Sequence, residues 1–205
     1  LLDGATLRFV PEDVRPDGAA LVAELTRTGI DVLDIAPTQL GAIMDAGGFG
    51  DESPVTRVLV GGEQIADSTW RWMASDRRRA YFNVYGPTEC TVDATLARVS
   101  GVDTVAGDPL ANIDVFVVGR NGRPTADGAP GEVWIGGVCV ADGYVGRPVE
   151  TAERFVPRPG GEGSRAYATG DRARWAPAGG RQLLGRLDGQ VKLSGHRVDL
   201  GEVDA

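Results

Sequence analysis

"YFNVYGPTECTVDATLA", residues 81–97, joins a short apolar run to polar side chains at a Gly86–Pro87 corner. A chain bends where glycine meets proline, because glycine tolerates unusual dihedral angles and proline fixes its own. Tyr85 precedes the corner, and Thr88 and Glu89 follow it. We expect a strand whose polar end faces a ligand. The alternative is a Gly–Pro turn with incidental polar groups.

Strand and helix patterns alternate before this corner. Apolar periodicity and boundary residues predict helices over residues 17–29, 37–48 and 67–79. Strands are predicted from β-branched and aromatic runs at residues 4–10, 30–35, 56–62 and 81–86. Such alternation is typical of parallel strands joined by crossover helices. Since ligands collect at the carboxyl ends of parallel strands, "VLVGGE" (58–63) and the corner should share a binding edge.

The pattern changes after about residue 105. Short apolar runs are then separated by Gly, Pro and Asn turns, with one short helix expected near 148–155. We therefore predict an α/β subdomain over residues 1–105, followed by a mostly β subdomain over 106–187. The second should be an antiparallel sheet or a small barrel.

The composition is that of a globular protein, with 42% hydrophobic and 24% charged residues and a formal charge of -8. Nucleic-acid binding requires clustered Lys and Arg, so we expect none. Arg77–Arg79 is interpreted as a solvated helix end, and the alternative is a nucleic-acid contact. No apolar run approaches the roughly 20 residues that span a bilayer, and no signal-peptide pattern is seen. Cys90 and Cys139 lack a metal-ligand spacing, which favours a reduced, cytoplasmic setting without membrane contact.

Four motifs follow one another along the chain: "NVYGPTE" (83–89), "GEVWIGG" to "VADGYVGRP" (131–148), "YATGD" (167–171) and "GRLDGQVKLSGHRVDLGEVDA" (185–205). Their order and spacing resemble those of adenylate-forming enzymes, above all the amino-acid adenylation domains of nonribosomal peptide synthetases, many of which make antibiotics. The resemblance implies that an amino acid reacts with ATP and Mg²⁺, releasing pyrophosphate. It further implies transfer to the phosphopantetheine thiol of a carrier protein, a neighbouring condensation domain and, in many members, an MbtH-like protein partner.

The resemblance implies a nucleotide site with two walls around the adenine ring, a phosphate contact and a metal ligand. Tyr85 would stack on adenine beside Gly86, and Asn83 would read the adenine edge. The opposite wall would be formed by the backbone of Gly61, Gly62 and Glu63, because missing side chains permit close approach. Thr88 would bind the α-phosphate. Glu89 would hold Mg²⁺, a cation that prefers carboxylate and phosphate oxygens.

Three further positions near the end of the chain receive roles from the resemblance. Asp171 would accept hydrogen bonds from the ribose hydroxyls, and Arg186 would reach the ribose or phosphates. The alternatives are that Asp171 is only a turn residue after Gly170 and that Arg186 is only a surface charge. Asp188 would be the hinge of a small C-terminal subdomain that begins within residues 188–205. Lys192 follows on that side, with its role left open.

The resemblance also implies an amino-acid pocket, lined by Asp34, Leu59, Gly61, Val84, Val92 and Asp93. Two carboxylates in a small apolar pocket are costly unless a partner pairs with them. A substrate amide or ammonium could do so, whereas a substrate carboxylate would need an added positive group. The lining resembles that for glutamine or glutamate, with ornithine also open. The alternative is that Asp34 and Asp93 simply face solvent.

Other parts that the resemblance implies are not found in these 205 residues: a phosphate loop, an aspartate for the substrate ammonium and a C-terminal lysine. We therefore interpret the sequence as a piece truncated at both ends and expect it to be inactive alone. Two alternatives stay open. One is an acyl-CoA or aryl-acid ligase of the same superfamily, and the other is a non-catalytic module that binds an MbtH-like protein.

Overall fold

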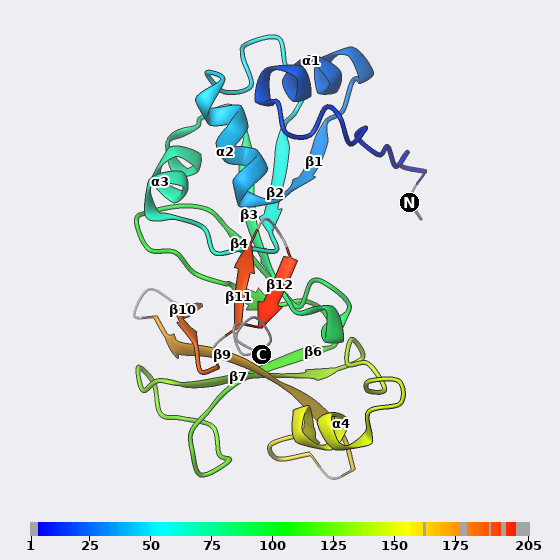
Figure 1. Cartoon of the computed structure of the whole chain (residues 1–205). Coiled ribbons are helices and arrows are strands. Elements are labelled where there is room, and N and C mark those ends of the chain that lie inside the picture. Colours follow the sequence, from blue (N-terminus) through cyan, green and yellow to red (C-terminus); the bar gives the residue numbers. More distant parts are fainter. Residues whose placement is uncertain (1–3, 162, 177–179, 189, 194–195, 200–205) are drawn as a thin grey trace.

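The computed structural model describes residues 4–161, 163–176, 180–188, 190–193 and 196–199, with the backbone alone for the last two ranges. Helices and strands follow one another as Figure 1 shows. The helical segments are α1 (Gly18–Thr28), α2 (Pro37–Asp45), α3 (Asp67–Ser75), the 3-10 turn η1 (Thr88–Cys90) and α4 (Pro148–Arg154). The strands are β1 (Val32–Ile35), β2 (Arg57–Gly61), β3 (Ala80–Tyr85), β4 (Thr95–Arg98), β5 (Asp108–Pro109), β6 (Ile113–Val118), β7 (Gly131–Gly137), β8 (Phe155–Pro157), β9 (Arg165–Trp175), β10 (Arg181–Arg186), β11 (Gln190–Leu193) and β12 (His196–Asp199).

The first sheet, sheet A, has the strand order β1-β2-β3-β4-β5. β1, β2 and β3 run parallel, and α2 and α3 connect them, so the predicted α/β arrangement is confirmed. β4 and β5 extend the sheet in antiparallel pairing beyond β3. Neither of these two strands was predicted. Sheet A is therefore a mixed sheet.

Local capping explains where the helices begin and end. The carboxylate of Asp17 accepts hydrogen bonds from the backbone amides of Ala19 and Ala20 at 2.9 and 3.0 Å, which satisfies the first free donors of α1. α1 ends at Gly29, whose left-handed conformation closes the last turn. Pro37 opens α2, because its ring already holds a helical φ and the first helical position needs no amide donor.

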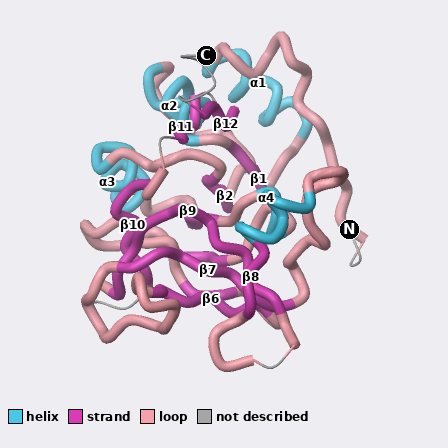
Figure 2. The backbone as a smooth tube through the Cα atoms, turned by 60° about the horizontal axis from the view of Figure 1, so that its bottom comes forward, coloured by secondary structure: helices cyan, strands magenta, loops and turns pink. Residues whose placement is uncertain are grey.

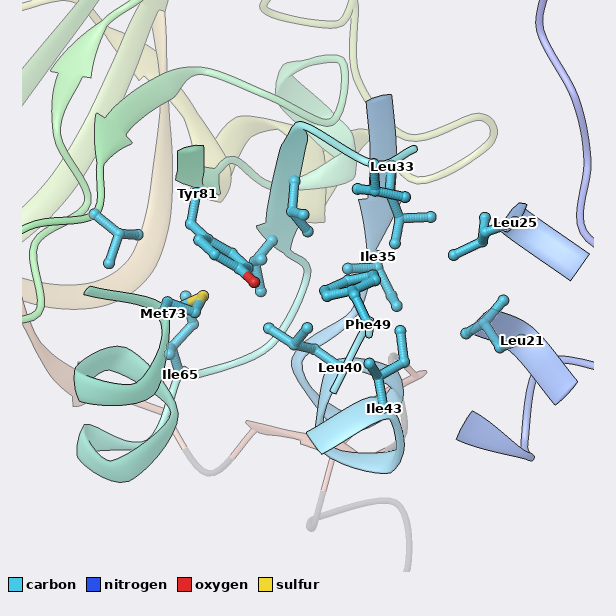
Figure 3. Close-up of a cluster of buried hydrophobic side chains, with 14 of the residues drawn as sticks. Leu21, Leu25, Leu33, Ile35, Leu40, Ile43, Phe49, Ile65, Met73 and Tyr81 are labelled. Atoms are coloured by element: carbon cyan, nitrogen blue, oxygen red, sulfur yellow. The ribbon is translucent and has the colours of Figure 1, made fainter. Parts of the chain in front are cut away.

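The helices bury one face of sheet A. Figure 3 shows side chains from α1, α2 and α3 meeting those of the strands, among them Leu21, Leu25, Leu33, Ile35, Leu40, Ile43, Met73 and Tyr81. In β2, Val58 and Val60 are fully buried in this core, whereas Leu59 and Gly61 point to the other face. The second face of sheet A thus presents the side chains that alternate with the core.

The second sheet, sheet B, has the order β10-β9-β7-β6, with β8 paired to β9. All its pairs are antiparallel, and the sheet curls into a half-barrel next to α4 (Figure 2). The prediction of a mostly β, barrel-like second half is confirmed. β11 and β12 form a separate hairpin.

Two local predictions are wrong. Residues 4–10 form no strand, and Leu7 and Phe9 are exposed, because strand-forming side chains need a neighbouring strand and β1 has none on that side among the described residues. The third helix ends at Ser75 and not at Arg79. Arg78 and Arg79 instead pair with Asp51 and Asp76, so they do not mark a helix end.

Membrane insertion through a helix finds no support in the described residues. None of their helices combines the length and the apolar character that crossing a bilayer requires.

Candidate functional site

Tyr85 and Asp171, 86 residues apart, meet where the two sheets face each other. The Tyr85 hydroxyl donates to Asp171 Oδ2 at 2.6 Å. Burial raises the pKa of Tyr85 well above its usual value, and the charge of Asp171 raises it further. Tyr85 ends β3 of sheet A, and Asp171 lies in β9 of sheet B. The contact therefore fixes one sheet against the other.

Arg186 holds the same carboxylate from a neighbouring strand. Its Nη1 donates to Asp171 Oδ1 at 2.7 Å, because the β9–β10 register places the two residues opposite each other. Burial alone lowers the pKa of Arg186, but the bond to Asp188 and the nearby carboxylates outweigh it and raise the pKa. The guanidinium therefore stays charged beside Asp171.

Asp188 closes this cluster on its far side. Arg186 donates to it through Nε at 2.6 Å and Nη2 at 2.8 Å, and Arg154 of α4 donates at 3.2 Å. Gly170 packs directly beneath, with φ +77°, and an added Cβ would lie 2.7 Å from both Arg186 and Asp188. The glycine of "ATGD" is therefore required by close packing as well as by its backbone conformation.

The turn after β3 presents Thr88 and Glu89. Thr88 is exposed, whereas Glu89 is partly buried and accepts a hydrogen bond from the Tyr144 hydroxyl at 2.7 Å. That hydroxyl lies 3.1 Å from the hydroxyl of Tyr167. Tyr144 has no role predicted from the sequence, although it belongs to the second motif. Its position in "DGYVGRP" was the available indication.

Glu89 fits the role of a magnesium ligand in its chemistry. It offers carboxylate oxygens held in place by Tyr144, and Mg²⁺ is usually bound by one or two carboxylates together with substrate phosphates. Within the described residues no group of three or more His, Cys, Asp or Glu side chains could hold a metal by itself. A metal here would thus depend on oxygens supplied by the nucleotide.

Asn83 and Glu63 make contacts within the protein that the sequence did not predict. Asn83 is buried, and its amide nitrogen donates to the backbone oxygen of Val105 at 2.7 Å. Both Glu63 carboxylate oxygens accept bonds from Thr38 at 3.1 Å, which caps the start of α2. These side chains therefore have structural contacts whatever they do with a nucleotide.

Glycines keep the turn region tight. Gly61 lies opposite Val84, and an added Cβ would come within 2.6 Å of Val84 atoms. At Gly86 the corresponding distance to the backbone oxygen of Val92 is 2.3 Å. Gly62 has φ +85°, a conformation that glycine adopts without strain. Gly61 and Gly86 therefore leave no room for a larger residue at these two positions.

Sheet register places the predicted pocket residues on one face. Asp34 is opposite Leu59, and Gly61 is opposite Val84, so all four lie on the face that the helices leave uncovered. Burial raises the pKa of Asp34 and of Asp93, and the charge of Asp34 adds to the rise at Asp93. The two carboxylates thus face a common region. Val92, with φ +69°, is 65% exposed beside them.

The structure therefore gathers the predicted residues into two neighbouring groups. Tyr85, Asp171 and Arg186 meet across the sheets, with the turn of Thr88 and Glu89 directly following Tyr85. The residues of the predicted amino-acid pocket lie on sheet A and in the loop after η1.

Known proteins resemble this chain in both sequence and structure. The family model described as AMP-binding enzyme matches residues 1–145. The chain belongs to the AMP-binding enzyme family. This AMP-binding chain is 44% identical over 206 residues to the AMB antimetabolite synthetase AmbE of Pseudomonas aeruginosa. It is 41% identical over 209 residues to the phosphinothricin tripeptide synthetase PhsB of Streptomyces viridochromogenes.

Solved structures give the same family assignment. An NRPS protein containing adenylation and PCP domains, PA1221, matches 91% of the AMP-binding chain with a TM-score of 0.82 and 29% identity. A four-domain nonribosomal peptide synthetase bound to AMP and glycine matches 95% of it with a TM-score of 0.79 and 34% identity. The chain spans 39% and 15% of these two structures, and 10% and 18% of AmbE and PhsB. It corresponds to part of an adenylation domain.

Proposed function

We propose that the full-length protein containing this chain activates an amino acid as its aminoacyl adenylate and loads it onto a carrier protein. The observation that supports this most strongly is the meeting of Tyr85, Asp171 and Arg186 across the two sheets. A ring, a carboxylate and a guanidinium suit the base, the ribose hydroxyls and the phosphates of one nucleotide. The family assignment supports the same reading.

In the first half-reaction, a carboxylate oxygen of the amino acid attacks the α-phosphorus of ATP, and the bond to pyrophosphate breaks. Adenine lies between two walls. Tyr85 stacks on one face of the ring beside Asn83 and Gly86, and the backbone of residues 61–63 covers the other face. Asp171 accepts hydrogen bonds from the ribose hydroxyls, since each of its carboxylate oxygens has a lone pair beyond the one used by Tyr85 or Arg186. These groups orient the nucleotide so that the α-phosphorus faces the amino acid.

Thr88 and Arg186 hold the phosphate oxygens as charge develops on them. Glu89, oriented by Tyr144, would hold Mg²⁺, and the metal would offset the negative charge of the departing pyrophosphate. In the second half-reaction, a phosphopantetheine thiol of the carrier protein attacks the acyl carbon, and AMP leaves. The sulfur–carbon bond replaces the carbon–oxygen bond of the adenylate.

We propose glutamine or glutamate as the amino acid. Desolvation raises the pKa of Asp34 and of Asp93, although Asp34 also accepts a backbone hydrogen bond from Ile35, and a substrate amide or ammonium would supply further hydrogen-bond donors to both. Charge alone favours glutamine, and a lysine contributed by another segment would favour glutamate. Leu59, Val84 and Val92 would contact the aliphatic part of the side chain.

The remaining assignments are proposals of the same kind. Asp188 would act as the hinge between residues 1–187 and a C-terminal subdomain, with Arg154 and Arg186 holding it in the present arrangement. Within residues 1–187 we propose a division near residue 105. A condensation domain and an MbtH-like protein would be further partners.

Pyrophosphate exchange tests the proposed function. The full-length protein is incubated with ATP, labelled pyrophosphate and each amino acid in turn. We expect exchange above background with glutamine or glutamate and less with the other amino acids. Exchange with a different amino acid would overturn the substrate assignment alone. Absence of exchange with every amino acid would overturn the function.

A further inference from the structure

One short stretch, here called the bridging segment, is hydrogen-bonded to both sheets. It consists of Val105, Ala106 and Gly107. From sheet A, the buried side chain of Asn83 donates to Val105 O at 2.7 Å, and the buried Thr95 hydroxyl donates to Ala106 O. Gly107 has φ +83°, and an added Cβ would lie 2.2 Å from Leu96 O. The bridging segment is therefore bonded to sheet A and packs against it too closely for a side chain at position 107.

Arg181, the first residue of β10, forms hydrogen bonds to the bridging segment from sheet B. Its backbone oxygen accepts from Ala106 N at 2.8 Å, and its Nη1 donates to Gly107 O at 3.0 Å. Its Nη2 donates to Val115 O at 3.0 Å. Val115 belongs to β6, and β6 and β10 are the two edges of the main strand order of sheet B. Arg181 thus joins both edges of sheet B to the segment held by sheet A.

Burying the charged side chain of Arg181 costs desolvation free energy. Only 4% of it is exposed, none of the ion pairs among the described residues includes it, and its guanidinium lies 4.3 Å from the ring centre of Trp175. Burial lowers the pKa of Arg181, with the charge of Asp108 opposing that effect. A well-packed apolar residue of similar size is often at least as stabilising as a buried charge. Stability alone therefore does not account for an arginine at this position.

The position of Arg181 relative to the nucleotide site suggests what it does. Asn83 lies two residues before Tyr85 on β3, and Arg181 lies five residues before Arg186 on β10. The bridging segment connects the two strands through Asn83 and Arg181. On β10 this connection and the Arg186–Asp171 contact lie at opposite ends, whereas on β3 Asn83 and Tyr85 both lie in the C-terminal half. We propose that Arg181 is a positioning residue that, through the bridging segment, sets sheet B against sheet A so that Tyr85 meets Asp171. As far as it concerns the nucleotide, this role rests on the proposed function.

Kinetics of Arg181→Leu in the full-length protein distinguishes positioning from a general structural role. The predicted nucleotide site spans both sheets, whereas the predicted amino-acid pocket belongs to residues 34–93 of the sheet A half. We expect the KM for ATP to rise roughly tenfold, a modest effect for a shift in positioning, while the KM for the amino acid changes less than about twofold. Arg181→Lys, which keeps the charge but not the two-pronged geometry, should give an intermediate rise.

Arg174→Leu is the matched control. Arg174 is an exposed arginine on the paired strand β9 that bonds Gln182. Both KM values should stay unchanged in this variant. Equal rises in the two KM values for Arg181→Leu, or no rise in the KM for ATP, would overturn the proposal. If Arg181→Leu fails to fold, the same comparison is made with Arg181→Lys.

A second measurement does not depend on activity. Tyr85→Phe removes the hydrogen bond to Asp171, and its effect on the thermal midpoint is measured in the parent protein and in the Arg181→Leu or Arg181→Lys background. If Arg181 aligns the two partners, the decrease caused by Tyr85→Phe should be smaller in the variant background. An equal decrease in both backgrounds would refute the alignment. If no amino acid supports exchange, the proposed function fails, and this measurement still decides the role of Arg181.

Discussion

Tyr85 has two roles in the proposed site, since its hydroxyl bonds Asp171 and its ring would stack on the base. The sequence predicted Tyr85, Asp171 and Arg186 through resemblance to known motifs, but it gave no indication of the bond that joins them. Tyr144 and Arg181 had no assigned role, because a tyrosine after glycine and an arginine in "GGRQ" look like ordinary surface residues. Their side-chain hydrogen bonds reach partners 55 and 66 or more residues away.

The two roles of Tyr85 can be separated by substitution. Tyr85→Phe keeps the ring and should leave ATP affinity within about threefold, while unfolding free energy falls by about 1.5 kcal/mol through loss of a charge-assisted bond. Tyr85→Ala removes stacking worth roughly 1–3 kcal/mol, so ATP should bind about 5- to 150-fold more weakly. Titration calorimetry and denaturant unfolding measure the two effects.

Tyr81→Phe is the control for Tyr85. The Tyr81 hydroxyl bonds Asp76 at 3.0 Å on the helix side of the same strand. Its loss should lower stability in a similar way without changing ATP affinity. Weakened ATP binding in Tyr81→Phe would show that the measurement reports stability and not stacking.

Asp93→Asn tests the pocket through pH. Burial and the charge of Asp34 raise the pKa of Asp93 above its ordinary value near 3.8, so folding favours the protonated form. Such a group stabilises the fold below about pH 4 and loses that contribution as the pH rises through its raised pKa. Asp93→Asn should therefore raise the thermal midpoint at pH 7, by a small amount because the side chain is half-exposed, and the gain should vanish near pH 4.

Thermal unfolding between pH 3.5 and 7.5 measures this dependence. Asp127→Asn, in an exposed turn, serves as the control and should show no comparable change with pH. A gain of equal size at every pH would argue against a carboxyl that resists ionisation.

At the scale of elements, local pattern was sufficient for the helices and the parallel strands but not for the added strands. α1 has its own capping residues in Asp17 and Gly29, so its limits were predictable from nearby sequence. β5 is two residues long and exists through pairing with β4. Residues 4–10 show the converse, because strand-forming composition without a neighbouring strand gave no strand. Pairing between distant segments is what the local pattern does not contain.

Two helical glycines should respond to alanine in opposite directions. A Cβ on Gly18 of α1 would lie 2.0 Å from the backbone oxygen of Ala42 in α2, whereas a Cβ on Gly41 of α2 has nothing within 4 Å. Gly18→Ala should force the helices apart and lower the unfolding free energy by about 1–3 kcal/mol. Gly41→Ala should raise it by about 0.5–1 kcal/mol through helix propensity. Denaturant unfolding measures the free energy of unfolding of both variants. A change of the same sign in the two would contradict the close crossing of α1 and α2.

At the scale of the whole molecule, the two sheets contribute different parts of the proposed site. The α/β half and the half-barrel were both predictable as fold classes. Their mutual placement was not, because the bridging segment is bonded to Asn83 on one side and to Arg181 on the other, across 22 to 75 residues of sequence.

Hydrogen exchange of the full-length protein tests this division. ATP at 100 times its Kd should slow opening by up to about 100-fold and should protect residues 83–89 and 165–175 together. The amino acid alone should protect sheet A residues near 34, 59 and 84 without protecting 165–175. The exposed turn at 119–124 is an internal reference in both experiments. Protection by ATP restricted to one sheet would contradict a nucleotide held between them.

Every residue of the proposed amino-acid pocket in this chain falls between Asp34 and Asp93, so a contiguous cassette of about 60 positions would carry this chain's share of substrate choice. Exchanging that cassette between related synthetases would leave Asp171, Arg186 and Arg181 untouched on the recipient. A graft that begins before β1 and ends before residue 105 separates Asn83 from Val105. The Asn83–Val105 hydrogen bond then forms only if the incoming cassette carries an asparagine at position 83. Under the proposed function, a successful exchange of substrate specificity would therefore have to keep that side-chain amide.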